Sequence, residues 1–166
     1  MNLTEYKQLI AAWGEKMNEK NLAQLILYDI ELFNNFIKNI NKERNIENKT
    51  LTERQFFVLL KIYKYKKMEL KNLSKELNVS TSSLCILLNK LVDQNYVYRK
   101  EDSRDRRNTF YGITEYGEAV INNEMKTISS IIESKFNALS SEDRTIMVES
   151  LQNIKSITKK MIDMEI

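Results

Sequence analysis

Residues 70 to 113 constrain the fold of this chain most strongly, because two short helix patterns there are followed by two strand-like runs. Leucines at three- and four-residue spacing predict helices over 71–77 and 81–94, and Asn78-Val79-Ser80 supplies the turn between them. The runs 96–100 and 109–113 predict two strands around an arginine-rich loop. Helix, turn, helix and hairpin in this order predict a winged helix-turn-helix, which points to duplex DNA.

An arginine-rich loop of this length can cross the backbone of a duplex and enter the minor groove, where narrow A·T-rich segments attract guanidinium groups. Asp102 and Asp105 are interleaved with the arginines. Loops of this composition are more often solvated surface, so the loop by itself is weak evidence for DNA binding. Its position directly after the helix-turn-helix is what favours DNA binding.

Net positive charge is concentrated in the middle of the chain. Residues 61 to 107 hold twelve lysines and arginines against six acids, whereas the whole chain has a net charge of only +3. A basic central region between mildly acidic ends is what phosphate neutralisation by one sub-region requires. A general bias of the composition toward lysine is the alternative explanation.

Local capping signals place the central helices. Thr52 and Gln55 have capping-box spacing at the start of a helix, Ser80 is expected to cap the helix over 81–94, and Asn95 is expected to end it in the left-handed conformation. Met68 to Leu70 is expected to be extended. The residues expected to face inward are Phe56, Leu59, Leu60, Tyr63, Leu73, Leu77, Leu84, Leu87, Leu88 and Leu91.

The outer parts of the chain are also helical in pattern. Apolar spacing predicts a helix over 22–40, residues 39–49 are polar and predict a loop, and helices over 114–139 and 140–164 follow the hairpin. Ser140 and Asp143 offer a cap for the last of these. The long amphipathic helices have little of their own domain to pack against, which favours pairing with a second copy over a monomeric bundle.

Composition excludes most enzyme classes. The chain has no histidine, no proline, three glycines and one cysteine, so imidazole catalysis, the usual zinc sites and glycine-rich phosphate loops cannot be built, and no cofactor is expected. No apolar run approaches the roughly 18 residues of a membrane span. The absence of a secretory signal pattern and of a cysteine pair predicts a cytoplasmic protein without an internal disulfide.

Several runs together resemble the MarR family of winged-helix transcriptional regulators. The Asp-x-Arg wing, followed at short distance by Thr-Glu-x-Gly, is the most specific part. The matching runs are Leu51-Thr52-Glu53-Arg54-Gln55-Phe56, Leu73-Ser74-Lys75-Glu76-Leu77-Asn78-Val79-Ser80, Leu91-Val92-Asp93-Gln94-Asn95-Tyr96-Val97, Asp105-Arg106-Arg107 and Ile113-Thr114-Glu115-Tyr116-Gly117.

The resemblance implies a single domain over 1–166 that is mainly α with a small β-wing. Residues 1–48 and 114–166 would form dimerisation helices, and residues 50–113 the winged helix-turn-helix DNA-binding region. It further implies a homodimeric regulator of transcription that binds a palindromic operator, acts as a repressor or an activator, and releases DNA when a small aromatic or anionic effector binds. The alternative is a winged-helix protein-interaction module without specific DNA binding.

By the same resemblance, Arg107 enters the minor groove and Asp105 orients it, although Asp105 could equally stabilise the turn. Arg104 and Arg106 would contact phosphates near the tip of the loop. Lys71 and Lys90 are phosphate candidates on geometry, and a solvated lysine is equally compatible with each. The full set expected at the DNA is Lys71, Ser80, Thr81, Ser82, Ser83, Ile86, Lys90, Arg104, Asp105, Arg106 and Arg107.

The chain departs from this pattern at Cys85 and Ile86, where many relatives carry polar or basic residues. Neither side chain can make the bidentate guanine contacts of an arginine, but both can contact thymine methyls, so an A·T-rich operator is expected. Cys85 is expected to be an inert small residue, with a redox role as the alternative. Trp13, Tyr28, Phe36 and Tyr63 are aromatic enough to line an effector pocket, although core packing explains them equally well.

Overall fold

The structure is a computed structural model that describes residues 18–47, 50–101 and 108–164 and the single positions 4, 8 and 11. The chain divides into two compact units, Met1–Glu43 and Arg44–Ile166. Helix α2, Glu19–Glu47, makes up nearly all of the described part of the first unit and runs on into the second. Its first turn is closed by Asn18, whose side-chain oxygen accepts a hydrogen bond from the backbone N–H of Asn21 at 3.0 Å.

The expected loop over 39–49 is wrong, because α2 continues to Glu47. The polar composition of this segment conceals an inward-facing side chain, that of Arg44, which is only 2% exposed. Its burial is compensated by polar partners in the second unit, and these partners hold the last turns of α2 in helical form.

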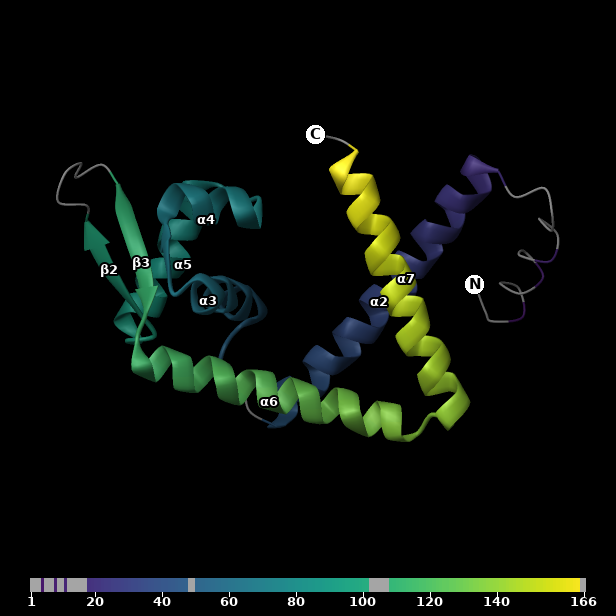
Figure 1. Cartoon of the computed structure of the whole chain (residues 1–166). Coiled ribbons are helices and arrows are strands. Elements are labelled where there is room, and N and C mark those ends of the chain that lie inside the picture. The colour runs from purple at the N-terminus through teal and green to yellow at the C-terminus, as the bar shows by residue number, and fades with distance from the viewer. Residues whose placement is uncertain are drawn as a thin grey trace. The chain divides into compact units, whose positions relative to one another are not determined.

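The second unit contains the expected winged helix-turn-helix (Figure 1). Helices α3, α4 and α5 precede a hairpin of β2 and β3, and a third strand, β1, pairs antiparallel with β3 in a sheet of order β1-β3-β2. The fold is therefore mainly α with a small sheet, as predicted. The bounds are α3 Glu53–Tyr65, β1 Lys67–Glu69, α4 Leu70–Leu77, α5 Thr81–Asp93, β2 Val97–Glu101 and β3 Thr109–Ile113.

The predicted caps are confirmed. Thr52 and Gln55 form both bonds of a capping box at the start of α3, and the Ser80 hydroxyl accepts from the backbone N–H of Ser83 at 3.3 Å at the start of α5. Asn78, with φ of 50°, ends α4, and Asn95, with φ of 58°, follows α5, both in the left-handed region. These local signals fix where each helix of the unit begins and ends.

A single apolar core joins the three helices to the sheet. The side chains of Leu59, Ile62, Leu73, Leu88 and Leu91 have no measurable exposure. They come from α3, α4 and α5 and pack with residues of the hairpin and of α6. Most of the leucines that were predicted to face inward are buried, and Leu60, Leu77 and Leu87 are half-buried at the edge of the core. This packing fixes which face of α5 points outward.

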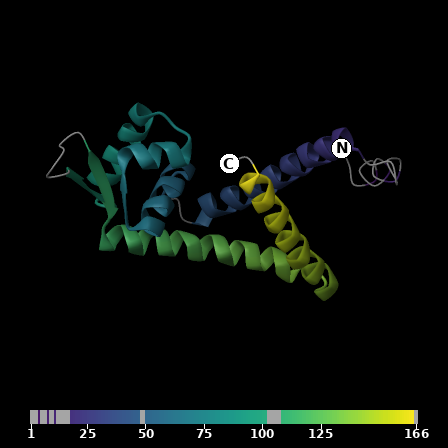
Figure 2. The same cartoon turned by 45° about the horizontal axis from the view of Figure 1, so that its top comes forward.

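Two long helices complete the chain, α6 Glu115–Asn137 and α7 Ser141–Asp163. The hairpin projects from the end at which α6 begins (Figure 2). The predicted Ser140 cap is confirmed, because its hydroxyl accepts from the backbone N–H of Asp143 at 3.0 Å. No helix in the described ranges is both long and apolar enough to cross a membrane.

The Thr-Glu-x-Gly run forms the joint between the hairpin and α6. The Thr114 hydroxyl accepts from the backbone N–H of Gly117 at 2.9 Å and donates to the carbonyl of Asn95 at 2.7 Å. Gly117 packs against the main chain of Tyr96 so closely that a Cβ at this position would lie 1.9 Å from the carbonyl oxygen. Only glycine permits this approach, which anchors α6 to the turn that follows α5.

We expect Gly117→Ala to destabilise the protein by about 1–3 kcal/mol, because the added methyl group must push α6 away from the Tyr96 backbone. The change should lower the Tm in thermal unfolding by several degrees. Asn122→Ala, at an exposed position of the same helix, is the control and should leave the Tm nearly unchanged. An unchanged Tm for Gly117→Ala would show that the joint is not tightly packed.

Candidate nucleic-acid interface

Helix α5 has one buried face and one exposed face. Leu84, Leu88 and Leu91 are at most 2% exposed, whereas the side chain of Ile86 on the opposite face is 64% exposed. The other residues of α5 predicted at the DNA, Thr81, Ser82, Ser83 and Lys90, are also exposed. The structure therefore gathers them on one accessible helix, with dimensions that fit a major groove.

The turn that precedes α5 is locked by polar contacts. The Ser74 hydroxyl donates to the carbonyl oxygen of Val79 at 2.6 Å, and the Val79 N–H donates to the carbonyl oxygen of Ser74 at 3.1 Å. The Ser80 hydroxyl donates to the Ser83 hydroxyl at 2.9 Å. The first turn of α5 therefore presents hydroxyls and backbone N–H groups in fixed positions, an arrangement that favours phosphate. The role of Ser74 was not predicted from the sequence.

The departure at Cys85 and Ile86 is now placed in space. Ile86 lies on the outward face of α5, as the predicted helical register requires, and Cys85 is half-buried beside it. The Ile86 side chain is 64% exposed, so it is free to contact a partner outside the chain. Contact with thymine methyl groups would bury it.

The wing is formed by the β2–β3 hairpin, in which Val97 pairs with Ile113 and Glu101 with Thr109. Arg99 and Lys100 are exposed on β2, and Arg99 lies 3.4 Å from the carboxylate of Glu101. Gly112 packs against the ring of Tyr98. Four predicted DNA-contacting residues of the loop, Arg104, Asp105, Arg106 and Arg107, lie outside the described residues, so their roles remain predictions.

The remaining basic residues differ in whether an acidic side chain of the same chain pairs with them. Lys71 is exposed in the first turn of α4. Lys61 lies 2.8 Å from the carboxylate of Glu76, and Lys66 lies 2.6 Å from that of Glu118. The hydrogen bond with Glu76 raises the pKa of Lys61, and the same bond lowers the pKa of Glu76. Lys61 and Lys66 are thus partly neutralised within the chain, while Lys71 and Lys90 are better placed for phosphate.

The aromatic residues proposed for an effector pocket are dispersed in the chain. Trp13 lies outside the described residues, Tyr28 and Phe36 lie on α2, and Tyr63 lies on α3, where Lys66 approaches its ring to 4.8 Å. Tyr28 is exposed, and the other two are half-buried. An open hollow of about 560 Å³ lies at the end of α3 and along α4 and includes none of the four. Its lining residues are Tyr65, Met68, Asn72, Lys75 and Glu76.

Two polar contacts of the interior, one buried and one part-buried, were not predicted from the sequence. Arg44 is paired with Glu124 of α6, and the side chain of Gln55 is bonded to that of Gln94. Arg44 follows Ile37 and Ile40 at helical spacing, which is the signal that could have identified it as inward-facing. The Gln55–Gln94 bond joins residues 39 positions apart and has no local signal.

Comparison with known proteins agrees with this geometry. The MarR family model matches residues 51–109. The HTH-type transcriptional regulator SarZ of Staphylococcus epidermidis is 34% identical over 103 residues, which are 62% of this chain and 68% of SarZ. The chain belongs to the MarR family.

Solved structures show the same fold at low sequence identity. The transcriptional regulator Tm0710 of Thermotoga maritima has a TM-score of 0.65 at 24% identity, covering 82% of this chain and 98% of Tm0710. FabT of Streptococcus pneumoniae, solved in complex with DNA, has a TM-score of 0.63 at 21% identity, covering 84% of this chain and 99% of FabT. MarR-family proteins are transcriptional regulators rather than enzymes, and this MarR-family chain is a DNA-binding regulator.

Exposure of Ile86 makes a direct test of the recognition face possible. We expect Ile86→Arg to leave the Tm unchanged, because the new guanidinium stays in water, and to shift base preference toward G·C at one position of each half-site. Binding to randomised duplexes measures the shift, and thermal unfolding measures stability. A collapse of the Tm would mean that Ile86 is buried against another element or chain.

Proposed function

We propose that this MarR-family protein is a homodimeric repressor that binds an A·T-rich palindromic operator and releases it when a small aromatic or anionic effector binds. The observation that carries the DNA-binding part is the exposed face of α5, which presents hydroxyls, Ile86 and Lys90 above a closed leucine core. The structural likeness to FabT, which was solved with DNA, supports the same use of the fold.

A homodimer is supported by the apolar surface of α7. This helix has no buried residue, although it carries eight large apolar side chains. Water-exposed apolar surface of this extent marks an interaction site. A second copy is the simplest partner, because a two-fold axis between two winged helices matches a palindrome. The exposed members are Ile146, Met147, Val148, Leu151, Ile154, Ile157, Met161 and Ile162.

An A·T-rich operator follows from the chemistry of the face and the wing. Ile86 can bury its side chain against thymine methyls but cannot hydrogen-bond guanine. The arginines of the wing loop favour the narrow, electronegative minor groove of A·T-rich segments. Phosphate contacts from Lys71, Lys90, Arg104 and Arg106, and from the hydroxyls of Thr81, Ser82 and Ser83, would supply the part of the affinity that is independent of sequence.

Repression and release by an effector rest on the family resemblance. Dimeric regulators of this kind need two arrangements with different affinity for DNA, and an effector acts by binding one of them better. The aromatic side chains of Tyr28, Phe36 and Tyr63, together with Trp13, are candidates for contact with an effector. A shift of the DNA-binding curve in the presence of small aromatic carboxylates would support this part.

The wing gives a testable prediction. Arg107→Ala should weaken operator binding by about 1–3 kcal/mol, because a minor-groove guanidinium is lost, while the Tm stays unchanged. Asp105→Ala should show a smaller defect of the same kind, because Arg107 then keeps its charge but samples more rotamers. Gel-shift titration against duplexes selected from genomic DNA measures both. Lys126→Ala, at an exposed position of α6, is the control.

If Arg107→Ala binds the operator with the affinity of the wild-type protein, Arg107 has no role in the minor groove.

Salt dependence separates the proposal from the alternative of a protein-interaction module. Duplex binding should weaken linearly in log affinity against log salt concentration, whereas docking of an apolar helix face to a protein should not.

A further inference from the structure

We propose that polar contacts, buried at Arg44 and Glu124 and part-buried at Gln55, hold the recognition helix α5 at a fixed angle to α6. They would thereby set the half-site spacing that the protein accepts in its operator. These contacts involve Arg44, Leu51, Thr52, Gln55, Gln94 and Glu124, which we call the polar strut. The inference rests on the proposed function, because half-site spacing has meaning only for a dimer on a palindrome.

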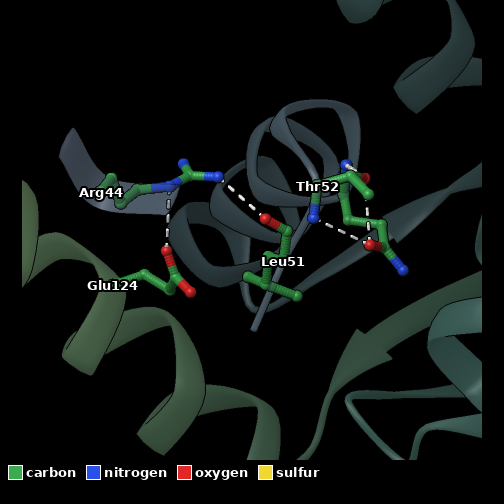
Figure 3. A network of polar contacts seen from close by, with 5 residues as sticks. Arg44, Leu51, Thr52 and Glu124 are labelled. Atoms are coloured by element: carbon green, nitrogen blue, oxygen red, sulfur yellow. Dashed lines mark hydrogen bonds and ion pairs between the residues drawn. The ribbon is translucent and has the colours of Figure 1, made fainter. Parts of the chain in front are cut away.

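One end of the strut is the Arg44 guanidinium. Its Nη2 donates to the carbonyl oxygen of Leu51 at 2.8 Å, and its Nε lies 3.4 Å from Oε2 of Glu124 on α6 (Figure 3). Its Cζ lies 5.4 Å from the ring centroid of Phe56. The Arg44 and Glu124 side chains are 2% and 3% exposed. Arg44 therefore ties α6 to the residue that directly precedes the cap of α3.

The other end is the Gln55 side chain. Its Oε1 accepts from the backbone N–H and from the hydroxyl of Thr52, each at 3.0 Å, which fixes the first turn of α3. Its Nε2 donates to Oε1 of Gln94 at 2.9 Å. Gln94 is the C-cap of α5, so polar contacts and one turn of main chain lead from α6 to the end of the recognition helix.

Stability alone does not account for a buried ion pair here. Apolar side chains of similar volume usually stabilise a core as well as a buried pair or better. Among the described residues, Nε of Arg44 and Oε2 of Glu124 also have no well-aligned hydrogen-bond partner. The bonds to Leu51 and Gln94 add direction, because a hydrogen bond fixes an angle that apolar packing leaves free to slide. The Arg44–Glu124 ion pair adds a charge attraction that draws α6 toward Arg44.

The angle between α5 and α6 affects the separation of the two recognition helices in a dimer, because α6 connects the winged helix to α7, which carries the proposed dimer contact. The two recognition helices of a dimer must reach successive major grooves, about 34–36 Å apart along the duplex. A shift of one base pair moves a half-site by about 3.4 Å and turns it by about 35° around the duplex axis. The two copies must share this change, so the angle between α5 and α6 decides which spacing both recognition helices can reach.

The first test replaces the pair by apolar residues, as Arg44→Met with Glu124→Leu, so that no charge is left buried alone. Probes are the selected operator and duplexes with one base pair added or removed between the half-sites. We expect the variant to fold with a lowered Tm, because the buried Leu51 carbonyl loses its Arg44 donor. Discrimination between the native spacing and the altered ones should fall about tenfold, the order of one mismatched base pair. The matched control, Lys61→Met with Glu76→Leu, removes the exposed 2.8 Å ion pair between α3 and α4 and should keep the discrimination.

The second test removes the hydrogen bond between the side chains of Gln55 and Gln94. Gln55→Glu keeps the capping box and can accept from the Gln94 amide, and Gln94→Glu can accept from the Gln55 amide, so each single variant should retain the bond. Together they place two carboxylates face to face. The double variant should lose far more spacing discrimination than the product of the two single losses.

The outcomes separate this inference from the proposed function. The inference is overturned if the wild-type protein discriminates between half-site spacings and the folded strut variants discriminate equally well. If the apolar double variant does not fold, the Gln55→Glu and Gln94→Glu variants decide. The strut is overturned if the double variant loses only the product of the two single losses in spacing discrimination. A larger loss in the double variant supports the strut. A wild-type protein that binds all duplexes alike would count against the proposed function itself.

Discussion

Helix α7 leaves a large apolar surface in water. Each of its large apolar side chains is at least 40% exposed, over a helix of 23 residues. Burying that surface is worth roughly 25 cal/mol for each Å². This surface supports the proposed association with a second copy, in which two winged helices would bind DNA as a pair.

Within the second unit, the closed core decides which face of α5 points outward. Buried leucines of α3, α4 and α5 leave α5 with only one orientation, in which Ile86 and the serines of its first turn point outward. The Thr114 cap and Gly117 then join the end of the recognition helix to α6. The base-reading surface and the helix that leads toward the proposed dimer contact are thus held by one short run of sequence.

Much of this architecture follows from local signals, which is why it could be predicted. Caps at Thr52, Ser80 and Ser140 and the left-handed residue Asn95 depend on a few neighbouring residues, and leucine spacing determines the inward face of α5. Contacts distant in sequence could not be predicted in this way. The pairing of β1 with β3 and the bond between Gln55 and Gln94 depend on the assembled fold.

The wrong loop over 39–49 has a similar cause. A polar segment with one buried arginine has the composition of a loop, and only the partners of Arg44, the Leu51 carbonyl and Glu124, explain why it is helical. Of the candidate DNA interface, the sequence predicted the exposed residues of α5 and the isolated isoleucine. It did not predict Ser74, which fixes the turn, or the contacts behind α5.

Sedimentation of Ile154→Glu beside Gln152→Glu, alone and with the selected operator, tests whether the apolar face of α7 forms the dimer contact. Both changes add one negative charge to α7, but Ile154 lies among the exposed apolar residues and Gln152 does not. The account predicts that Gln152→Glu sediments as a dimer that binds one palindrome, whereas Ile154→Glu loses the dimer and most of its operator affinity. An Ile154→Glu protein that remains dimeric and binds the operator with wild-type affinity would contradict the account.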